Sequence, residues 1–347
     1  MAARHSERKQ EHLRICLEEE VGSGITTGLE RYALRHCALP EMALEEVRTE
    51  TIFLGHPLRA PLLISAMTGG TPAARDINQR LATVAQDLGL AMGLGSQRTF
   101  LADPSVLGTY QVRRYAPDIL LLANLGAVQL NHGMTVSDCL RAVESVEADA
   151  LVLHLNPLQE ALQPEGDTDF RGLLAKIEHV CHQLPCPVVV KEVGWGLSAE
   201  VARHLVEAGV SALDIGGAGG TSWSEVERYR SRSEADAALA AAFINWGIPT
   251  ADALLEVRHA LPNVPLIASG GLENGVDMAL CLALGADLCG MARTLLAPAS
   301  ESAETLHATI EIILRQLRVA MFCVGACTLT ALDSSKVYRR CQEHPWP

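Results

Sequence analysis

Eight short apolar runs, separated by segments of helical periodicity, fill the sequence from Pro61 to Gly290. Each run is nearly continuous in apolar character, and each is followed by Gly, Asn or another loop-forming residue. Strands that are buried on both faces of a parallel sheet have this pattern. The predicted strands are Pro61–Ala66, Leu90–Leu94, Ile119–Ala123, Ala150–His154, Pro187–Lys191, Ala212–Ile215, Pro265–Ser269 and Ala286–Gly290.

Eight strands alternating with helices predict an α/β fold of the (β/α)8 TIM barrel type. The rival architecture is a doubly wound sheet, which usually has fewer strands and an early GxGxxG turn. No such turn follows the first run, so the barrel is favoured. The predicted helices carry apolar residues at helical spacing and end near Gly or Pro, as in Ala73–Leu88, Val136–Val146, Leu197–Glu207 and Ala251–Ala260.

Three segments lie outside this repeat. Residues 1–60 precede the barrel, which we place at 61–330, and we expect them to form a mostly helical extension with a hairpin around Val47–Leu58. The stretch Gly219–Thr250 after strand six is too long for an ordinary βα loop. Its Ala-rich piece Glu234–Phe243 predicts a helical lid over the barrel mouth. Residues 302–330 look helical, and 331–347 form a C-terminal tail.

Charge and composition exclude several classes of partner. The net charge of −13 argues against a nucleic-acid partner, whose phosphates need a basic face. The segment from Arg4 to Arg14 is too charged for a signal peptide, and no apolar run approaches the roughly 18 residues of a membrane span. The ten cysteines are scattered rather than paired at zinc-site spacing. We therefore expect a cytoplasmic protein with reduced thiols and no membrane partner.

Glycines at the ends of the last three strands predict a phosphate site. Gly270 and Gly271 follow strand seven, Ala292 and Arg293 follow strand eight, and Thr221 lies in the loop after strand six. Glycine lets backbone N–H groups approach an anion, and barrels often bind phosphate between the loops after strands seven and eight.

Polar residues end the middle strands of the barrel. Lys191 is the last residue of an otherwise apolar strand, which favours contact with an anion or an electron-rich ring. Formation of a Schiff base by this lysine is the alternative. His154, Asn156, Gln159 and Glu160 form a dense group that could bind a phosphorylated substrate or a hard divalent cation. The available cations are Arg98 after strand two and the pair Arg8 and Lys9 in the N-terminal extension.

The ordered set of these motifs resembles one family, the type 2 isopentenyl-diphosphate isomerases, which are FMN-dependent barrels. The resemblance covers most of the chain, from Arg8 to Arg293. Its most specific pieces are SAMTGG (65–70), GLGSQR (93–98), HLNPLQEALQPEGD (154–167), KEVGWGLS (191–198) and GGAGGTSW (216–223), to which NWGIPT (245–250) and ASGGL (268–272) add. One departure is Asn245, where the family pattern has an acidic residue.

The resemblance implies a role for each matching residue. Lys191, Gln159 and His154 would be catalytic, and Glu160 would bind Mg²⁺. FMN would contact Ala66, Met67, Thr68, Ser96, Asn124, Lys191, Thr221, Gly270, Gly271, Ala292 and Arg293. The diphosphate substrate would contact Arg8, Lys9, Ser96, Gln97, Arg98, His154 and Gln159.

The same resemblance implies the reaction, the interconversion of isopentenyl and dimethylallyl diphosphate in isoprenoid biosynthesis. Reduced FMN would act as acid or base, with NADPH as its reductant, and the protein would be a tetramer or octamer. Three alternatives stay open. One is an FMN barrel of another class, such as a 2-hydroxyacid oxidase, although no His-Gly-Gly-Arg segment occurs near strand six. The others are a Schiff-base aldolase and a non-enzymatic phosphate-binding regulator.

Overall fold

A closed barrel of eight parallel strands forms the centre of the protein. The computed structural model describes residues 2–340, and its barrel strands follow one another in the order β10-β11-β4-β5-β6-β7-β8-β9. Closure of the sheet excludes the doubly wound alternative, so the predicted (β/α)8 barrel is confirmed. The strands are β4 (Leu62–Ile64), β5 (Ala91–Gly93), β6 (Leu121–Gly126), β7 (Ala150–Leu155), β8 (Val188–Glu192), β9 (Ala212–Asp214), β10 (Leu266–Ser269) and β11 (Leu288–Met291).

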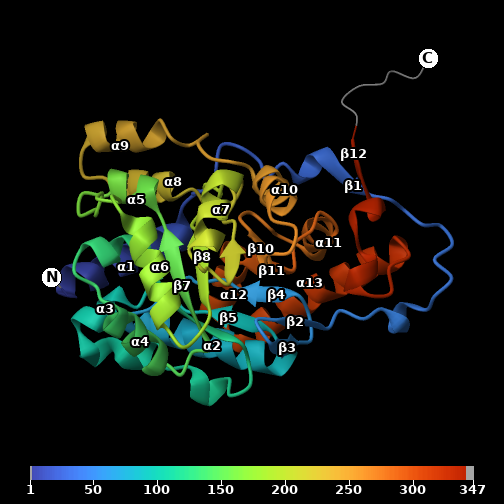
Figure 1. The fold of residues 1–347 in the computed structure, drawn as a ribbon, viewed down its shortest axis with the longest axis horizontal. Coiled ribbons are helices and arrows are strands. Elements are labelled where there is room, and N and C mark those ends of the chain that lie inside the picture. The colour runs from blue at the N-terminus through green and yellow to red at the C-terminus, as the bar shows by residue number, and fades with distance from the viewer. Residues whose placement is uncertain (1, 341–347) are drawn as a thin grey trace.

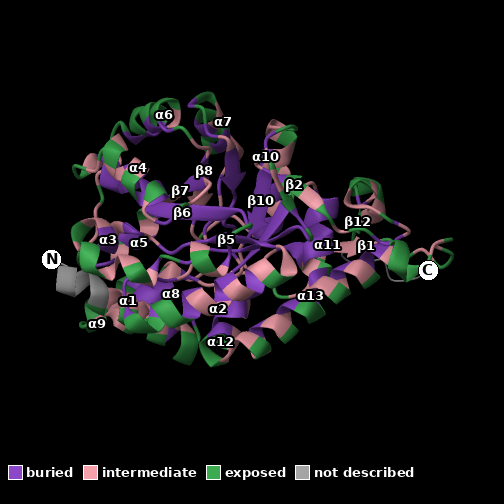
Figure 2. Cartoon of the chain, turned by 90° about the horizontal axis from the view of Figure 1, so that it is seen from below, coloured by how far each residue is buried: buried purple, intermediate pink, exposed green. Residues whose placement is uncertain are grey.

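Each predicted strand is present, and no end differs by more than three residues from the predicted one. Helices pack around the outside of the barrel, and their exposed faces point outward (Figure 2). They are α2 (Pro72–Leu88), α4 (Val136–Glu144), α6 (Leu173–Gln183), α7 (Ala199–Glu207), α10 (Thr250–Ala260), α11 (Gly275–Ala283), α12 (Arg293–Glu301) and α13 (Ala303–Cys323).

Local chemistry sets the bounds of the long helix α2. The hydroxyl of Thr71 accepts a hydrogen bond from the backbone N–H of Ala74, and Pro72 occupies the first turn, where its missing N–H costs nothing. At the other end Gly89 adopts φ 64°, a left-handed conformation that favours glycine and stops the helix. The chain then enters β5 directly.

The hairpin predicted within Val47–Leu58 is present as β2 (Thr51–Phe53) and β3 (His56–Leu58). Phe53 and Leu58 are buried together with the side chains that fill the barrel interior, among them Leu63, Val152 and Ile267. The hairpin therefore closes the barrel end opposite to the C-terminal ends of the strands, and it leaves only the other end open for a site.

The rest of the N-terminal extension is less helical than expected. Helix α1 (Ala2–Glu18) is followed by mostly irregular chain with two short 3₁₀ turns, η1 (Leu29–Arg31) and η2 (Leu44–Glu46), and strand β1 (Tyr32–Leu34). Strand β1 pairs antiparallel with β12 (Val337–Arg339), which lies in the segment predicted only as a tail. The segments near both ends of the chain are thus joined; residues 341–347 lie outside the described part.

The segment after β9 forms a cover of two helices. They are α8 (Trp223–Arg230) and α9 (Glu234–Ala241), the second of which matches the predicted Ala-rich helix. Both lie with α1 and α5 (Pro157–Leu162) at one end of the molecule, far from β1 and β12 (Figure 1). The shorter elements are α3 (Arg98–Ala102), η3 (Pro104–Thr109), η4 (Arg113–Tyr115), η5 (Ala127–Asn131), η6 (Leu329–Ala331) and η7 (Ser334–Lys336).

The length and the apolar character of a helix decide whether it could span a membrane. Among the described residues 2–340, the structure contains no helix that combines the length and the apolar character needed to cross a bilayer.

Candidate active site

One large cavity of about 870 Å³ opens at the C-terminal ends of the barrel strands. Helices α1 and α8 contribute to its wall through Arg8, Lys9, His12 and Trp223. The cavity brings together nearly all of the predicted site residues. Those that line it are Arg8, Lys9, Ala66, Met67, Thr68, Ser96, Arg98, Asn124, His154, Gln159, Glu160, Lys191, Thr221, Gly270, Gly271, Ala292 and Arg293.

Gln97 is the predicted substrate residue that the structure does not place in the cavity. Its side chain is fully buried behind the cavity wall, where it donates to the carbonyl of Ala142 and accepts from the backbone N–H of Asn124. Ser96 and Arg98, its neighbours in the sequence, do line the cavity. Gln97 therefore braces the ends of β5 and β6 instead of facing a ligand.

Close backbone approaches shape the cavity floor at the ends of β4 and β5. A Cβ atom on Gly95 would lie 2.4 Å from the carbonyl oxygen of Thr68, so only glycine fits there. Tyr110 packs against Gly69 so tightly that a Cβ on that glycine would lie 2.0 Å from its ring. The side-chain amide of Asn78 donates to the Thr68 carbonyl. The loop that carries Ala66, Met67 and Thr68 is therefore held in place by contacts within the protein itself.

The backbones of the loops after β9 and β10 also approach each other closely, beside the loop after β11. A Cβ on Gly220 would lie 2.4 Å from the backbone nitrogen of Gly271, and Gly270 adopts φ 109°. The hydroxyl of Thr250 donates to the Gly270 carbonyl and holds this turn. Arg293 begins helix α12 at the edge of the group. Backbone N–H groups and a helix start thus gather where the glycine pattern predicted a phosphate site.

Lys191 lies in β8 with an acidic partner. Its Nζ is 3.0 Å from Oδ2 of Asp214 and donates to the hydroxyl of Ser269 at 2.9 Å, while that hydroxyl donates to the other oxygen of Asp214. The Lys191 and Asp214 side chains are 14% and 2% exposed, so the ion pair is shielded from water. Lys191 also lines the cavity.

His154 is held as a neutral ring. Its Nδ1 lies 2.8 Å from Oδ1 of Asn124. Burial, together with the positive charges of Lys191, Lys9 and Arg8, lowers the pKa of His154 to about 4. A neutral imidazole can donate one hydrogen bond and accept another, and an anion brought near it would favour its protonation.

Lys9 and Arg8 line the cavity, and among the described residues neither forms an ion pair, although Glu160 and Glu227 lie near enough to Arg8 to oppose the lowering of its pKa by burial. Lys9 donates to the Ser96 carbonyl at 2.5 Å and to the hydroxyl of Tyr110 at 2.6 Å. Burial and the neighbouring Arg8 lower the pKa of Lys9 to about 7. Arg8 donates to the side-chain oxygen of Gln163, and its buried Nε lacks a hydrogen-bond partner. Buried cations in this state are suited to an anionic ligand.

Glu160 presents a single carboxylate to the cavity. Its oxygens accept hydrogen bonds from the side-chain amides of Asn156 and Gln163 and from the backbone N–H of Asp167. Asn156 also donates to Gln159, which fixes the orientation of that amide. In the part of the chain that the structure describes, no group of three or more His, Cys, Asp or Glu side chains is arranged to hold a metal ion.

Comparison with known proteins decides the family. The chain is 54% identical to an isopentenyl-diphosphate delta-isomerase of Synechococcus sp. over 96% of its own length and 97% of that protein. It is 49% identical to the enzyme of that name from Nostoc sp., with 98% of both chains covered, and 50% identical to that from Rickettsia bellii. The chain belongs to the isopentenyl-diphosphate delta-isomerase family.

Within that family this isomerase is of the FMN-dependent, type 2 kind. Residues 118–339 match the FMN-dependent dehydrogenase family. Solved structures show the same fold at low identity. A flavocytochrome b2 variant with sulfite bound aligns with a TM-score of 0.69 at 17% identity, covering 97% of this chain and 86% of that one. A lactate oxidase from Pediococcus acidilactici aligns with a TM-score of 0.67 at 15% identity, covering 98% and 94%.

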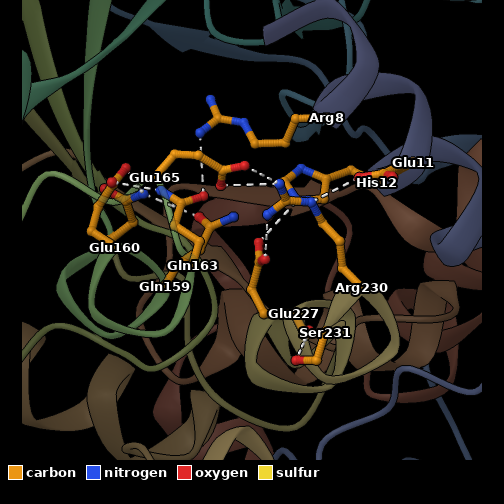
Figure 3. A network of polar contacts seen from close by, with 11 residues as sticks. Arg8, Glu11, His12, Gln159, Glu160, Gln163, Glu165, Glu227, Arg230 and Ser231 are labelled. Carbon is orange, nitrogen blue, oxygen red and sulfur yellow. Dashed lines mark hydrogen bonds and ion pairs between the residues drawn. The ribbon is translucent and has the colours of Figure 1, made fainter. Parts of the chain in front are cut away.

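Several residues around the site of this isomerase were not predicted from the sequence. Asp214 lies within an apolar run and Tyr110 in an irregular segment. A third group joins α1 to the lid: Arg230 contacts Glu11, Glu165 and Glu227, and Glu227 also contacts His12 (Figure 3). One available signal for Asp214 was an acidic residue inside a strand that is otherwise buried, where a cationic partner is required.

The lid residue Asn245, which departs from the family pattern, packs against the N-terminal extension. A Cβ on Gly24 would lie 2.1 Å from its side-chain oxygen, and the backbone N–H of Gly24 donates to the Ile244 carbonyl. The departure therefore lies at a contact between the lid and the extension, outside the cavity lining.

Proposed function

We propose that the protein interconverts isopentenyl diphosphate and dimethylallyl diphosphate with reduced FMN and Mg²⁺. One observation carries the proposal: two groups of residues that are suited to anions line the same cavity, which Lys191 and His154 also line. The first is the group of glycine-rich strand ends around Gly220, Gly270 and Gly271. The second is the cationic group of Arg8, Lys9 and Arg98. Two phosphorylated molecules, a nucleotide cofactor and a substrate, account for both.

The residues present fit FMN. A cavity of about 870 Å³ is within the size range of cofactor sites, and the fixed loop Ala66–Thr68 offers a floor beside it. Asn124 and Lys191 would lie along the ring, and Thr221, Gly271 and Arg293 would serve the phosphate end. When bound, reduced FMN supplies an acid–base group for moving a double bond without net redox change.

The protein's own groups complete the chemistry. The fixed charge of Lys191 favours an anionic ring edge, and it acts strongly because the Lys191 and Asp214 side chains are shielded from water. Gln159, oriented by Asn156, would contact the reacting carbons, and neutral His154 would donate to the diphosphate. Arg8 and Lys9 would hold the diphosphate so that its hydrocarbon part lies over the ring.

A single carboxylate fits Mg²⁺ that is bound mainly through the substrate. Mg²⁺ is commonly held by one or two carboxylates together with substrate phosphates and water. We propose Glu160 as that ligand. NADPH is the proposed reductant of the flavin. A homotetramer or homo-octamer and a cytoplasmic location are also proposed; the nine described cysteines are free thiols, which fits a reducing compartment.

A 2-hydroxyacid oxidase is the second candidate, because the solved structures with this fold include a lactate oxidase. That chemistry needs a histidine base and arginines that bind a carboxylate. Two described histidines line the cavity. The pKa of about 4 makes His154 a weak base, and His12 comes from α1 rather than from a strand end; β9 contributes no histidine to the lining. Identities of 15–18% to the FMN oxidases and dehydrogenases, against about 50% to the isomerases, also disfavour it.

The test is direct. Purified protein should carry flavin absorbance and, when reduced with NADPH in the presence of Mg²⁺, should convert isopentenyl diphosphate to its isomer. Absence of isomerisation by FMN-loaded, reduced protein would refute the proposal. Lactate or mandelate oxidation by the same sample would favour the second candidate.

A further inference from the structure

Arg230 holds three carboxylates from three different segments of the chain (Figure 3). Its Nε donates to Glu11 of helix α1 at 2.9 Å, and its Nη1 donates to Glu227 of its own helix α8 at 2.8 Å. Its Nη2 donates to both oxygens of Glu165, at 2.8 and 3.0 Å. Glu165 lies in the loop that follows α5. A single guanidinium therefore joins the lid, the N-terminal helix and a loop of the active site.

The centre of this network is buried. The side chains of Arg230 and Glu227 are 9% and 2% exposed, whereas those of Glu11 and Glu165 are 44% and 42% exposed. Burial raises the pKa of Glu227, but hydrogen bonding to His12 and the charge of Arg230 outweigh it and lower that pKa overall. Glu227 is therefore ionised, and it requires the cationic partner Arg230 to remain buried.

Of the segments that Arg230 contacts, α1 carries Arg8 and Lys9 of the cationic group, and the loop after α5 contacts Arg8 through Gln163. Glu11 and His12 lie three residues after Arg8 and Lys9 on α1, so anchoring the first pair sets the position of the second. On the other side, Glu165 lies within a loop whose Gln163 contacts both Arg8 and Glu160. The position of Arg230 therefore bears on the cations and on the proposed metal ligand at once.

A separate apolar contact also joins α1 to the lid. Ile15 and Val21 are buried against Val226 of α8. This contact does not involve Arg230, so loss of the guanidinium would leave the C-terminal half of α1 packed. The segment that carries Arg8 and Lys9 would then be the part that loosens.

We propose that Arg230 is a positioning residue that holds the N-terminal helix closed over the diphosphate site. It does not line the cavity itself, and it acts through Glu11, Glu165 and Glu227. The inference rests on the proposed function for the identity of the ligand. The closed position of α1 can be measured without any turnover.

The test compares Arg230→Ala with Arg228→Ala in the FMN-loaded full-length protein. Arg228 is matched because it lies on the same helix and pairs with Glu225, but it reaches neither α1 nor the α5 loop. Arg230→Ala should raise the rate of trypsin cleavage within the first 14 residues at least tenfold and weaken binding of inorganic pyrophosphate with Mg²⁺ about tenfold. It should raise KM for isopentenyl diphosphate to the same extent, with kcat within threefold and FMN content unchanged. Arg228→Ala should match the wild type in every measurement.

A second variant keeps the test valid if Arg230→Ala fails to fold. Glu165→Gln removes one exposed arm of the network and should raise KM about threefold at unchanged FMN content. Trypsin cleavage equal to that of Arg228→Ala, or a fall in kcat at unchanged KM, would overturn the positioning role. Increased cleavage in a protein that proves not to isomerise the substrate would refute the proposed function and leave the helix anchor intact.

Discussion

Lys191 and Asp214 face each other from neighbouring strands of the barrel, with Nζ 3.0 Å from Oδ2 and the Ser269 hydroxyl bonded to both residues. The pair places a buried positive charge at the cavity and balances it from behind. A lysine at this position without its carboxylate would be costly to bury, and a carboxylate without the lysine more so. The two residues therefore act as a unit, and of the two only Lys191 lines the cavity.

Removing Lys191 should therefore lower stability through its effect on Asp214 and lower turnover through its effect on the flavin. Lys191→Ala leaves Asp214 buried without a cation, and we expect it to lower the free energy of unfolding by about 3 kcal/mol. It should also lower kcat at least a hundredfold. Lys191→Ala combined with Asp214→Asn should recover most of the stability and none of the turnover. Chemical denaturation and single-turnover assays measure the two effects. Recovery of turnover in the double variant would contradict the role of Lys191 at the flavin.

Glu160→Gln tests the proposed magnesium ligand. The variant replaces a charged oxygen with a neutral amide, and it places an N–H₂ group against the donors of Gln163 and Asp167. The Mg²⁺ concentration for half-maximal activity should rise at least tenfold, with FMN content unchanged. Glu144→Gln, an exposed carboxylate at the end of α4, is the control and should leave the titration where it is in the wild type. An unchanged titration for Glu160→Gln would remove that residue as the ligand.

Lys9 should couple substrate binding to proton uptake. Burial and Arg8 lower its pKa to about 7, so at about pH 8 most of the free enzyme has a neutral Lys9. A diphosphate within reach favours the charged form and raises the pKa, so binding takes up close to one proton at that pH and less below pH 7. Calorimetry in buffers of different ionisation enthalpy measures the uptake.

The control for this coupling is Lys9→Arg, because a guanidinium stays charged at every accessible pH. It should bind inorganic pyrophosphate with little or no proton uptake at about pH 8. Equal uptake by the wild type and Lys9→Arg would assign the proton to another group, of which His154 is the nearest candidate.

The sequence predicted those parts of the site that repeat with the strands. Glycines and cations that follow the strands all lie at the same end of the barrel, so the fold brings them together whatever path each loop takes. The direction of single side chains was not predictable in the same way: Ser96, Gln97 and Arg98 are consecutive, and the turn that exposes the first and third buries the second.

Contacts between distant segments were also missed, for a physical reason. Glu227 and Arg230 lie in a charged stretch that is typical of a solvated helix face. Their burial depends in part on α1, which contacts them through residues more than 200 positions away in the sequence. The pairing of β1 with β12 is of the same kind, because each strand is too short to show a pattern by itself.

Gly95→Ala should disturb the cavity floor while leaving the overall fold intact. The new Cβ would lie 2.4 Å from the Thr68 carbonyl oxygen and 2.7 Å from its nitrogen, and both are backbone atoms held by neighbouring bonds. The loop Ala66–Thr68 must shift, so FMN affinity should fall at least tenfold, with a loss of about 1–3 kcal/mol in stability. Gly108→Ala is the matched control, because a Cβ on that exposed glycine meets no atom within 4 Å. Flavin titration of the apoprotein measures both variants. Wild-type affinity in Gly95→Ala would show that the flavin does not rest on this floor.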